Sequence, residues 1–189
     1  VRETILRFEE RLAAAGYVGY FDINCIASHR GVVPLETTSR FGYPTIPIQQ
    51  DGVLSPWKDF LAALGRGEDF DLRTRRGFQV GVVIAVPPYP FEDAATSERF
   101  SKDAVILWRR EMHEGIHPCE VRLEEGDWLL AGVSGYALVV TGTASTMIDA
   151  RREAYNRVKN VMIPNMFYRT DIGERWVRDG DLLQSWQLL

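Results

Sequence analysis

Hydrophobic residues near the start of the chain recur at helical spacing. Ile5, Phe8, Leu12 and Ala15 lie three or four residues apart, and charged residues occupy the opposite side. Gly16 follows directly and suits the C′ position, where a helix ends. The pattern therefore predicts an amphipathic helix that ends at Gly16.

The next segment has the composition of paired β-strands. Residues 17–27 are rich in β-forming side chains, Ser28-His29-Arg30-Gly31 is a turn signal, and residues 32–36 resume a strand. We therefore predict a β-hairpin over residues 18–38, with its turn centred between His29 and Arg30.

Polar side chains converge on one patch of this hairpin. Asp22 and Asn24 would lie roughly opposite Glu36 and Thr38, and cross-strand neighbours are about 5 Å apart. Glu36, Thr38 and Arg40 also occupy alternate positions, so on an extended strand they would share a face. Carboxylate and hydroxyl oxygens beside a guanidinium suit a divalent cation and the phosphates that it neutralises. The alternative is a strand whose polar face simply meets water.

The rest of the chain alternates between short strands and helices. A helix is predicted from Ser55-Pro56 to Gly65-Arg66-Gly67, and residues 78–86 form a buried strand that ends at three prolines. Residues 91–101 have the composition of a loop. Further strands are predicted at 104–108, 119–123, 127–131 and 136–142, followed by a helix over 146–161 and a tail over 176–189. The expected fold class is α+β.

Composition excludes several classes of protein. The chain has 189 residues, 46% of them hydrophobic and 25% charged, which is typical of a globular protein. Its net charge of −4 disfavours a nucleic-acid surface, and no apolar run approaches the ~18 residues of a membrane span. Two cysteines do not make a disulfide framework, so we expect a reducing, cytoplasmic setting. Partners are therefore expected to be small molecules, with no nucleic acid and no membrane.

Other chemically reactive residues give weaker signals. His113, His117 and Cys119 do not have the spacing of a structural zinc site, and a fourth ligand is missing. Cys25 lies in an apolar strand and is expected to be a buried, inert thiol. Arg169 and Asp171 have two interpretations, a contact to substrate or a structural ion pair.

Two motifs together indicate a family. The first is Glu36-x-Thr38-x-Arg40-Phe41-Gly42-x-Pro44, which resembles the hairpin motif Glu-Phe-Asn-x-Arg-Phe-Gly-Asp-Pro-Glu of the glycinamide ribonucleotide synthetases, a family of ATP-grasp ligases. The second is Phe167-Tyr168-Arg169-x-Asp171-Ile172-Gly173, which is similar to a C-terminal signature of the same family. Their order and spacing agree with the family as well.

The resemblance implies a domain organisation and a reaction. Residues 1–72 would be the C-terminal part of an ATP-grasp domain, an antiparallel sheet with helices. Residues 73–189 would be a small β-rich C-terminal domain with one long helix. The family joins glycine to phosphoribosylamine in purine biosynthesis, through an acyl phosphate made from ATP. The missing N-terminal ATP-grasp region would be the partner of this part, which would be inactive alone.

The resemblance also assigns roles to residues of the hairpin. Glu36 and Thr38 would bind Mg²⁺ or Mn²⁺ together with ATP, and Asp22 or Asn24 would add a ligand from the paired strand. Arg40 would be catalytic, stabilising charge on the transferred phosphoryl group or the acyl phosphate.

Departures from the family motif leave an alternative open. Thr38 replaces an Asn ligand, and Tyr43 and Thr45 replace two acids. The alternative is a non-catalytic binding or assembly module derived from an ATP-grasp enzyme, with degraded metal ligands.

Overall fold

The computed structural model describes residues 4–109 and 114–188 and divides the chain into two compact units. Within the described residues, unit 1 comprises residues 4–46, 53–75 and 174–188, and unit 2 comprises residues 47–52, 76–109 and 114–173. These units are defined by which parts of the backbone lie close together. They do not test the predicted domains 1–72 and 73–189, which remain a prediction.

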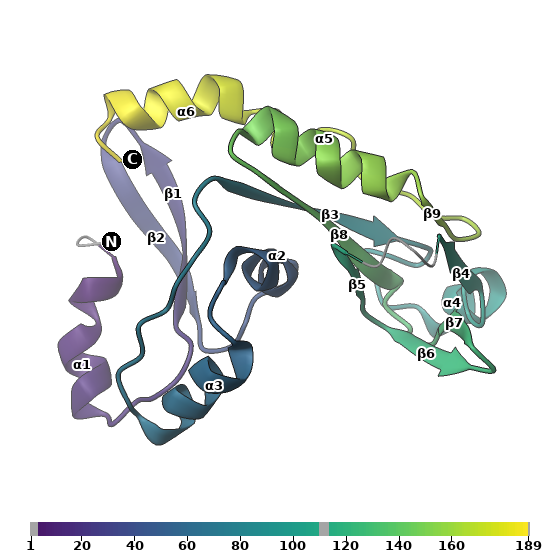
Figure 1. The fold of residues 1–189 in the computed structure, drawn as a ribbon, viewed down its shortest axis with the longest axis horizontal. Helices are drawn as coiled ribbons and strands as arrows, with labels where there is room; N and C mark the ends of the chain where they lie inside the picture. Colours follow the sequence, from purple (N-terminus) through teal and green to yellow (C-terminus); the bar gives the residue numbers. More distant parts are fainter. Residues whose placement is uncertain (1–3, 110–113, 189) are drawn as a thin grey trace. The chain divides into compact units, whose positions relative to one another are not determined.

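Unit 1 contains a hairpin and several helices (Figure 1). The predicted first helix is a 3-10 turn followed by an α-helix, and Gly16 after it has a φ of +63°, as its C′ position predicts. Gly67 ends α3 with a φ of +66°, which confirms the second predicted helix. The elements are η1 (Ile5–Arg7), α1 (Glu9–Ala14), β1 (Asp22–Ser28), β2 (Gly31–Thr38), α3 (Trp57–Arg66) and α6 (Trp176–Ser185).

Aromatic side chains pack together within unit 1. Phe41 lies between Tyr20 and Trp57, with ring centroids 4.6 and 6.1 Å away. Trp57 continues the contact to Phe60, which lies 5.7 Å from Phe70. Such tilted and edge-on ring contacts stabilise the segment that follows the hairpin.

Unit 2 is built on two antiparallel sheets. The first has the order β3-β8-β5, from β3 (Phe78–Ala85), β8 (Tyr136–Ala144) and β5 (Ile116–Pro118). The second has the order β6-β7-β4-β9, from β6 (Val121–Glu124), β7 (Asp127–Leu130), β4 (Val105–Trp108) and β9 (Val161–Met162). Helix α5 (Met147–Val158) covers β3 and β8 in Figure 1, and a short helix α4 (Ala94–Phe100) precedes β4. This mixture of helices and antiparallel sheets confirms the α+β class.

The core of unit 2 lies between α5 and the β3–β8 pair. Small residues on α5 let the helix approach the sheet closely, and Gly142 has its backbone against that helix. The fully buried side chains here are Val82, Ile84, Leu138, Val140, Ala150, Ala154 and Val158.

Several expectations from the sequence were wrong. Residues 94–100 form helix α4 instead of a loop, because Asp93 caps its N-terminus by accepting a hydrogen bond from the Ala95 amide. The predicted helix over 146–161 ends at Val158, since Val161 pairs with Trp108 in β9. Cys25 is exposed, because β1 and β2 form only a two-stranded sheet.

Three elements were not predicted from the sequence. They are helix α2 (Thr45–Gly52), strand β5 and the helix formed by residues 176–185.

Candidate functional site: one face of the β1–β2 hairpin

The hairpin brings the four predicted oxygen ligands together on one face. Asp22 pairs with Thr38 and Asn24 pairs with Glu36 across the strands. Directly paired residues of antiparallel strands point to the same side, so all four side chains share a face. The side-chain amide of Asn24 donates to Glu36 Oε1 at 2.8 Å, which agrees with this register.

A β-bulge creates this register. On the turn side of the bulge, Cys25 pairs with Pro34. The next pair away from the turn is Asn24 with Glu36, so Leu35 is the extra residue. Pro34 has no N–H to donate to the ladder. Proline within a sheet is therefore commonly found at a bulge, where the hydrogen-bond pattern is already interrupted. Without the bulge, Glu36 and Thr38 would lie on the face opposite to Asp22 and Asn24.

Exposure on this face differs between the four residues. Asn24 and Glu36 are exposed, whereas Asp22 and Thr38 are half-buried near the base of the hairpin. Carboxylate, amide and hydroxyl oxygens are hard ligands that suit Mg²⁺, a cation that commonly uses one or two carboxylates and completes its shell with phosphates and water. The residues present therefore fit such an ion.

Arg40 lies beyond the end of β2, which corrects the expectation that one extended strand carries all three alternate residues. Strand β2 ends at Thr38, and the exposed Arg40 donates from Nη1 to the carbonyl of Phe41 at 3.1 Å. In the described part of the chain no ion pair links Arg40 to a carboxylate, so its charge is available to an anion.

Packing of the residues after Arg40 fixes the start of α2. The Ile46 amide donates to the Gly42 carbonyl at 2.9 Å. A Cβ atom at Gly42 would lie 3.1 Å from Thr45 Oγ1 and 4.0 Å from Asp22 Oδ2. The neighbouring atoms therefore leave little space beside Asp22 for a residue larger than glycine at position 42.

The weaker candidates that the structure describes make hydrogen bonds within unit 2. His113 lies outside the described residues, and His117 contacts Thr141 and Asp51. Cys119 donates its thiol to the His117 carbonyl at 3.5 Å. Over residues 4–109 and 114–188, no group of three His, Cys, Asp or Glu side chains is arranged to hold a metal ion.

The C-terminal motif is attached to α5 within unit 2. Arg169 and Asp171 form an exposed ion pair with N–O distances of 2.6 and 2.9 Å. Tyr155 donates to the Arg169 carbonyl at 2.8 Å and accepts from the Ile172 amide at 3.1 Å. Burial raises the pKa of Tyr155, and the hydrogen bond from the Ile172 amide opposes this effect. These contacts attach the motif to α5.

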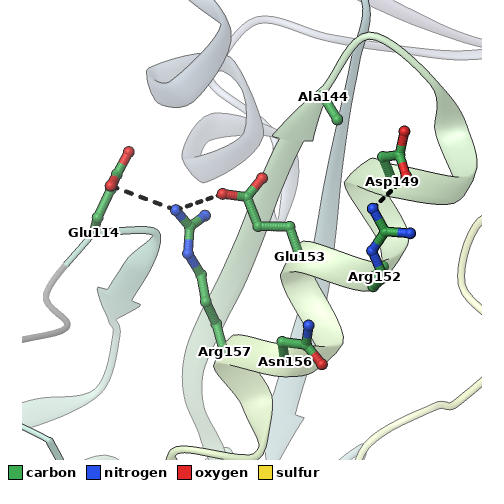
Figure 2. A pocket seen from close by; sticks show the side chains of 7 residues that line it. All are labelled: Glu114, Ala144, Asp149, Arg152, Glu153, Asn156 and Arg157. Carbon is green, nitrogen blue, oxygen red and sulfur yellow. Dashed lines mark ion pairs between the residues drawn. The ribbon is translucent and has the colours of Figure 1, made fainter.

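A separate cavity of about 590 Å³ lies along the exposed side of α5 (Figure 2). Arg157 extends between Glu153 and Glu114 at 2.9 and 3.6 Å, and Arg152 pairs with Asp149 at 2.6 Å. The acid–arginine spacing of three and four residues along α5 is the sequence signal for these pairs, although it did not predict the cavity. Because both arginines are paired with carboxylates, the cavity offers weaker recognition of a charged ligand than the hairpin face does.

None of the helices in the described ranges has the length and apolarity that a membrane span requires.

Comparison with known proteins connects unit 2 to a family. The family described as "Phosphoribosylglycinamide synthetase, C domain" matches residues 79–175. Two similar relatives, both called phosphoribosylamine–glycine ligase, come from Listeria innocua and Mycobacterium tuberculosis. The first is 29% identical over 154 residues, which is 79% of this chain and 34% of that protein. The second is 29% identical over 184 residues, which is 92% of this chain and 41% of that protein.

A solved structure has the same fold. The crystal structure of phosphoribosylamine–glycine ligase from Thermotoga maritima matches with a TM-score of 0.66 and 25% identity. The match covers 90% of this chain and 43% of that one. The chain therefore spans less than half the length of these relatives.

Proposed function

The chain belongs to the phosphoribosylglycinamide synthetase C-domain family, and from this premise we propose that it is the C-terminal part of an ATP-grasp carboxylate–amine ligase. The proposed reaction is that of phosphoribosylamine–glycine ligase in purine biosynthesis. A glycine carboxylate oxygen attacks the γ-phosphorus of ATP and ADP leaves. The amine of phosphoribosylamine then attacks the acyl phosphate, phosphate leaves, and the nitrogen loses a proton as the amide forms.

The hairpin would contribute the charged part of the active site. Glu36, Asp22, Thr38 and Asn24 would hold Mg²⁺ or Mn²⁺, which neutralises charge on the phosphate oxygens of ATP. Arg40 would donate hydrogen bonds to the transferred phosphoryl group, where negative charge develops. An upstream ATP-grasp region, which we propose for the complete protein, would supply the rest of the nucleotide site.

One observation carries this proposal, the shared face of the two strand pairs. The pairs Asp22–Thr38 and Asn24–Glu36 put two carboxylates, an amide and a hydroxyl on one side of the hairpin. The hydrogen bond from Asn24 fixes the orientation of the Glu36 carboxylate before any ligand binds.

Metal titration of the complete protein tests this assignment. Mn²⁺ binding in the presence of ATP is measured for the native protein, for Glu36→Ala and for the control Glu92→Ala, which changes an exposed acid on a loop. We expect Glu36→Ala to weaken Mn²⁺ binding by at least about tenfold, because even residues outside the ligand shell change metal affinity by about 10–100-fold. Glu92→Ala should have the affinity of the native protein. Equal affinity in all three proteins would remove the hairpin from the metal site.

A second candidate function is a non-catalytic binding module. Thr38 favours it, because a hydroxyl on a short side chain is a weaker ligand than the amide oxygen of the Asn in the family motif. The two functions differ in turnover. The ligase should release ADP over many turnovers only when glycine and phosphoribosylamine are both present, whereas the module should bind ATP or a metabolite without release of ADP. Thr38→Asn should raise Mn²⁺ affinity in either case.

A cytoplasmic location is part of the proposal. The support is the low number of cysteines, two in 189 residues, which suits a reducing compartment.

A further inference from the structure

A partly buried polar cluster in unit 2 connects α2 to the β3-β8-β5 sheet. Its members are Asp51 from α2, Thr141 from β8 and His117 from β5. Thr141 is completely buried, whereas the side chains of Asp51 and His117 are each 20% exposed. None of the functions proposed above uses this cluster.

Thr141 determines the direction of the hydrogen bonds. Its hydroxyl donates to Asp51 Oδ2, so the same oxygen accepts from His117 Nε2, which lies 3.1 Å away. His117 Nε2 also lies 3.6 Å from Asp51 Oδ1, and protonation of the imidazole makes this contact an ion pair. The cluster therefore requires an ionised Asp51 that accepts hydrogen bonds.

Close packing around the cluster keeps the second half of α2 on the sheet. A Cβ at Gly81 would lie only 2.6 Å from Cγ1 of Ile48, and a Cβ at Gly52 would lie 3.1 Å from Oε1 of Gln79. Both glycines let the helix approach the strands more closely than larger residues would. The carboxylate of Asp51 is thus held at a fixed place.

Charged groups on three elements act on Asp51. His117 on β5 and Arg157 on α5 attract its negative charge, and Arg157 also donates to the Thr141 carbonyl at 2.7 Å. Arg157 is in turn paired with Glu153 and Glu114 (Figure 2). Burial alone would raise the pKa of Asp51, but the close contact with His117, the hydrogen bond from Thr141 and the charge of Arg157 lower it below the ordinary 3.8.

We propose that Asp51, Thr141 and His117 form a pH-dependent anchor that holds the C-terminal half of α2 on the sheet of unit 2. The anchor itself does not depend on the proposed ligase function.

The sign of the pH dependence follows from the pKa of Asp51. A carboxylate whose pKa is lower in the folded state stabilises that state fully above its ordinary pKa. The contribution is lost as the pH falls through the lowered value. The contacts of Asp51 with Thr141 and His117 therefore hold α2 at neutral pH and weaken in acid.

Hydrogen exchange of the complete protein tests the anchor. Exchange of the amides of residues 49–52 is measured between pH 7 and pH 3, normalised at each pH to the rates of an unfolded peptide. We expect Asp51→Asn to speed this exchange about tenfold or more at pH 7, because the neutral amide loses the charge-assisted hydrogen bond from Thr141 and the attraction of His117. The difference between the two proteins should narrow as the pH falls below 3.8. Equal exchange at pH 7, or a difference that is the same at every pH, would overturn the proposal.

A carboxyl titration with matched threonine variants provides a second measurement. Thr141 and Thr143 lie two residues apart on β8 and point to the same face, but the Thr143 hydroxyl has no hydrogen-bond partner among the described residues. Thr141→Val should raise the pKa of the Asp51 carboxyl, followed by carbon NMR, and should speed exchange in α2. Thr143→Val should leave both unchanged. The anchor is wrong if Thr141→Val leaves the titration of Asp51 unchanged, or if Thr143→Val moves it as far.

Discussion

Gly142 has no room for a side chain, because β8 and α5 touch at this residue. A Cβ there would lie 2.4 Å from the Ala150 carbonyl oxygen and 2.4 Å from the Ala154 nitrogen. Both contacts are to backbone atoms of a packed helix, which cannot rotate away as a side chain can. Gly65 on α3 is the opposite case, since a Cβ there would meet no atom within 4 Å.

Replacing these two glycines by alanine should change stability in opposite directions. Gly142→Ala should lower the free energy of unfolding by on the order of 3 kcal/mol, because overpacking forces the helix away from the strand. Gly65→Ala should raise it by up to about 1 kcal/mol through higher helix propensity. Urea unfolding followed by circular dichroism measures both. Equal stability of Gly142→Ala and the native protein would show that α5 does not pack this closely.

At the scale of elements, the hairpin shows what the sequence could and could not predict. Alternation and the turn at Ser28–Gly31 were enough to predict both strands and the approximate pairing of Asp22 and Asn24 with Glu36 and Thr38. The bulge at Leu35 was not predicted, because a period-two pattern contains no signal for one unpaired residue.

Other misses have local causes. Helix α2 contains Pro47 and ends at Gly52, two residues with poor helix propensity, so packing of this segment outweighs its sequence pattern. Strand β5 is three residues long and ends at Pro118, and such a short run cannot be distinguished from a loop by alternation. The Asp51–Thr141–His117 cluster joins residues up to 90 positions apart, and spacing along the chain gives no sign of it.

Introducing a backbone N–H at position 34 should shift the pairing of β1 with β2. Pro34→Val lets the ladder continue without a bulge, so Leu35 pairs with Asn24, and Glu36 turns to the other face. We expect the NMR contacts between Asp22 and Thr38 to disappear in this variant. Deleting Leu35 in the same variant removes the extra residue and should restore those contacts. The bulge would have another cause if Pro34→Val kept the native pairing.

At the scale of the whole molecule, buried apolar side chains are unevenly distributed between the units. Of the buried hydrophobic residues described, Ala63 belongs to unit 1 and all the others belong to unit 2. The hairpin of unit 1 exposes Ile26, Val33 and Leu35 by 56%, 57% and 61%. A two-stranded sheet without a hydrophobic core is marginally stable in water. Unit 1 therefore has too little buried surface to hold its hairpin firmly, whereas unit 2 has a core of its own.

Hydrogen exchange should reveal this asymmetry in the 189-residue chain. Amides of β3 and β8 should be strongly protected, because they lie in a sheet beneath a packed helix, whereas those of β1 and β2 should exchange at least about a hundredfold faster through local opening. In the complete protein, contacts with the proposed upstream ATP-grasp region should raise the protection of β1 and β2 towards that of β8. Strong protection of β1 and β2 already in the 189-residue chain would mean that the hairpin is stable without added strands. If protection of the β1 and β2 amides does not rise in the complete protein, the upstream region would have to contact the chain elsewhere. The exposed apolar residues of the hairpin would then need another explanation.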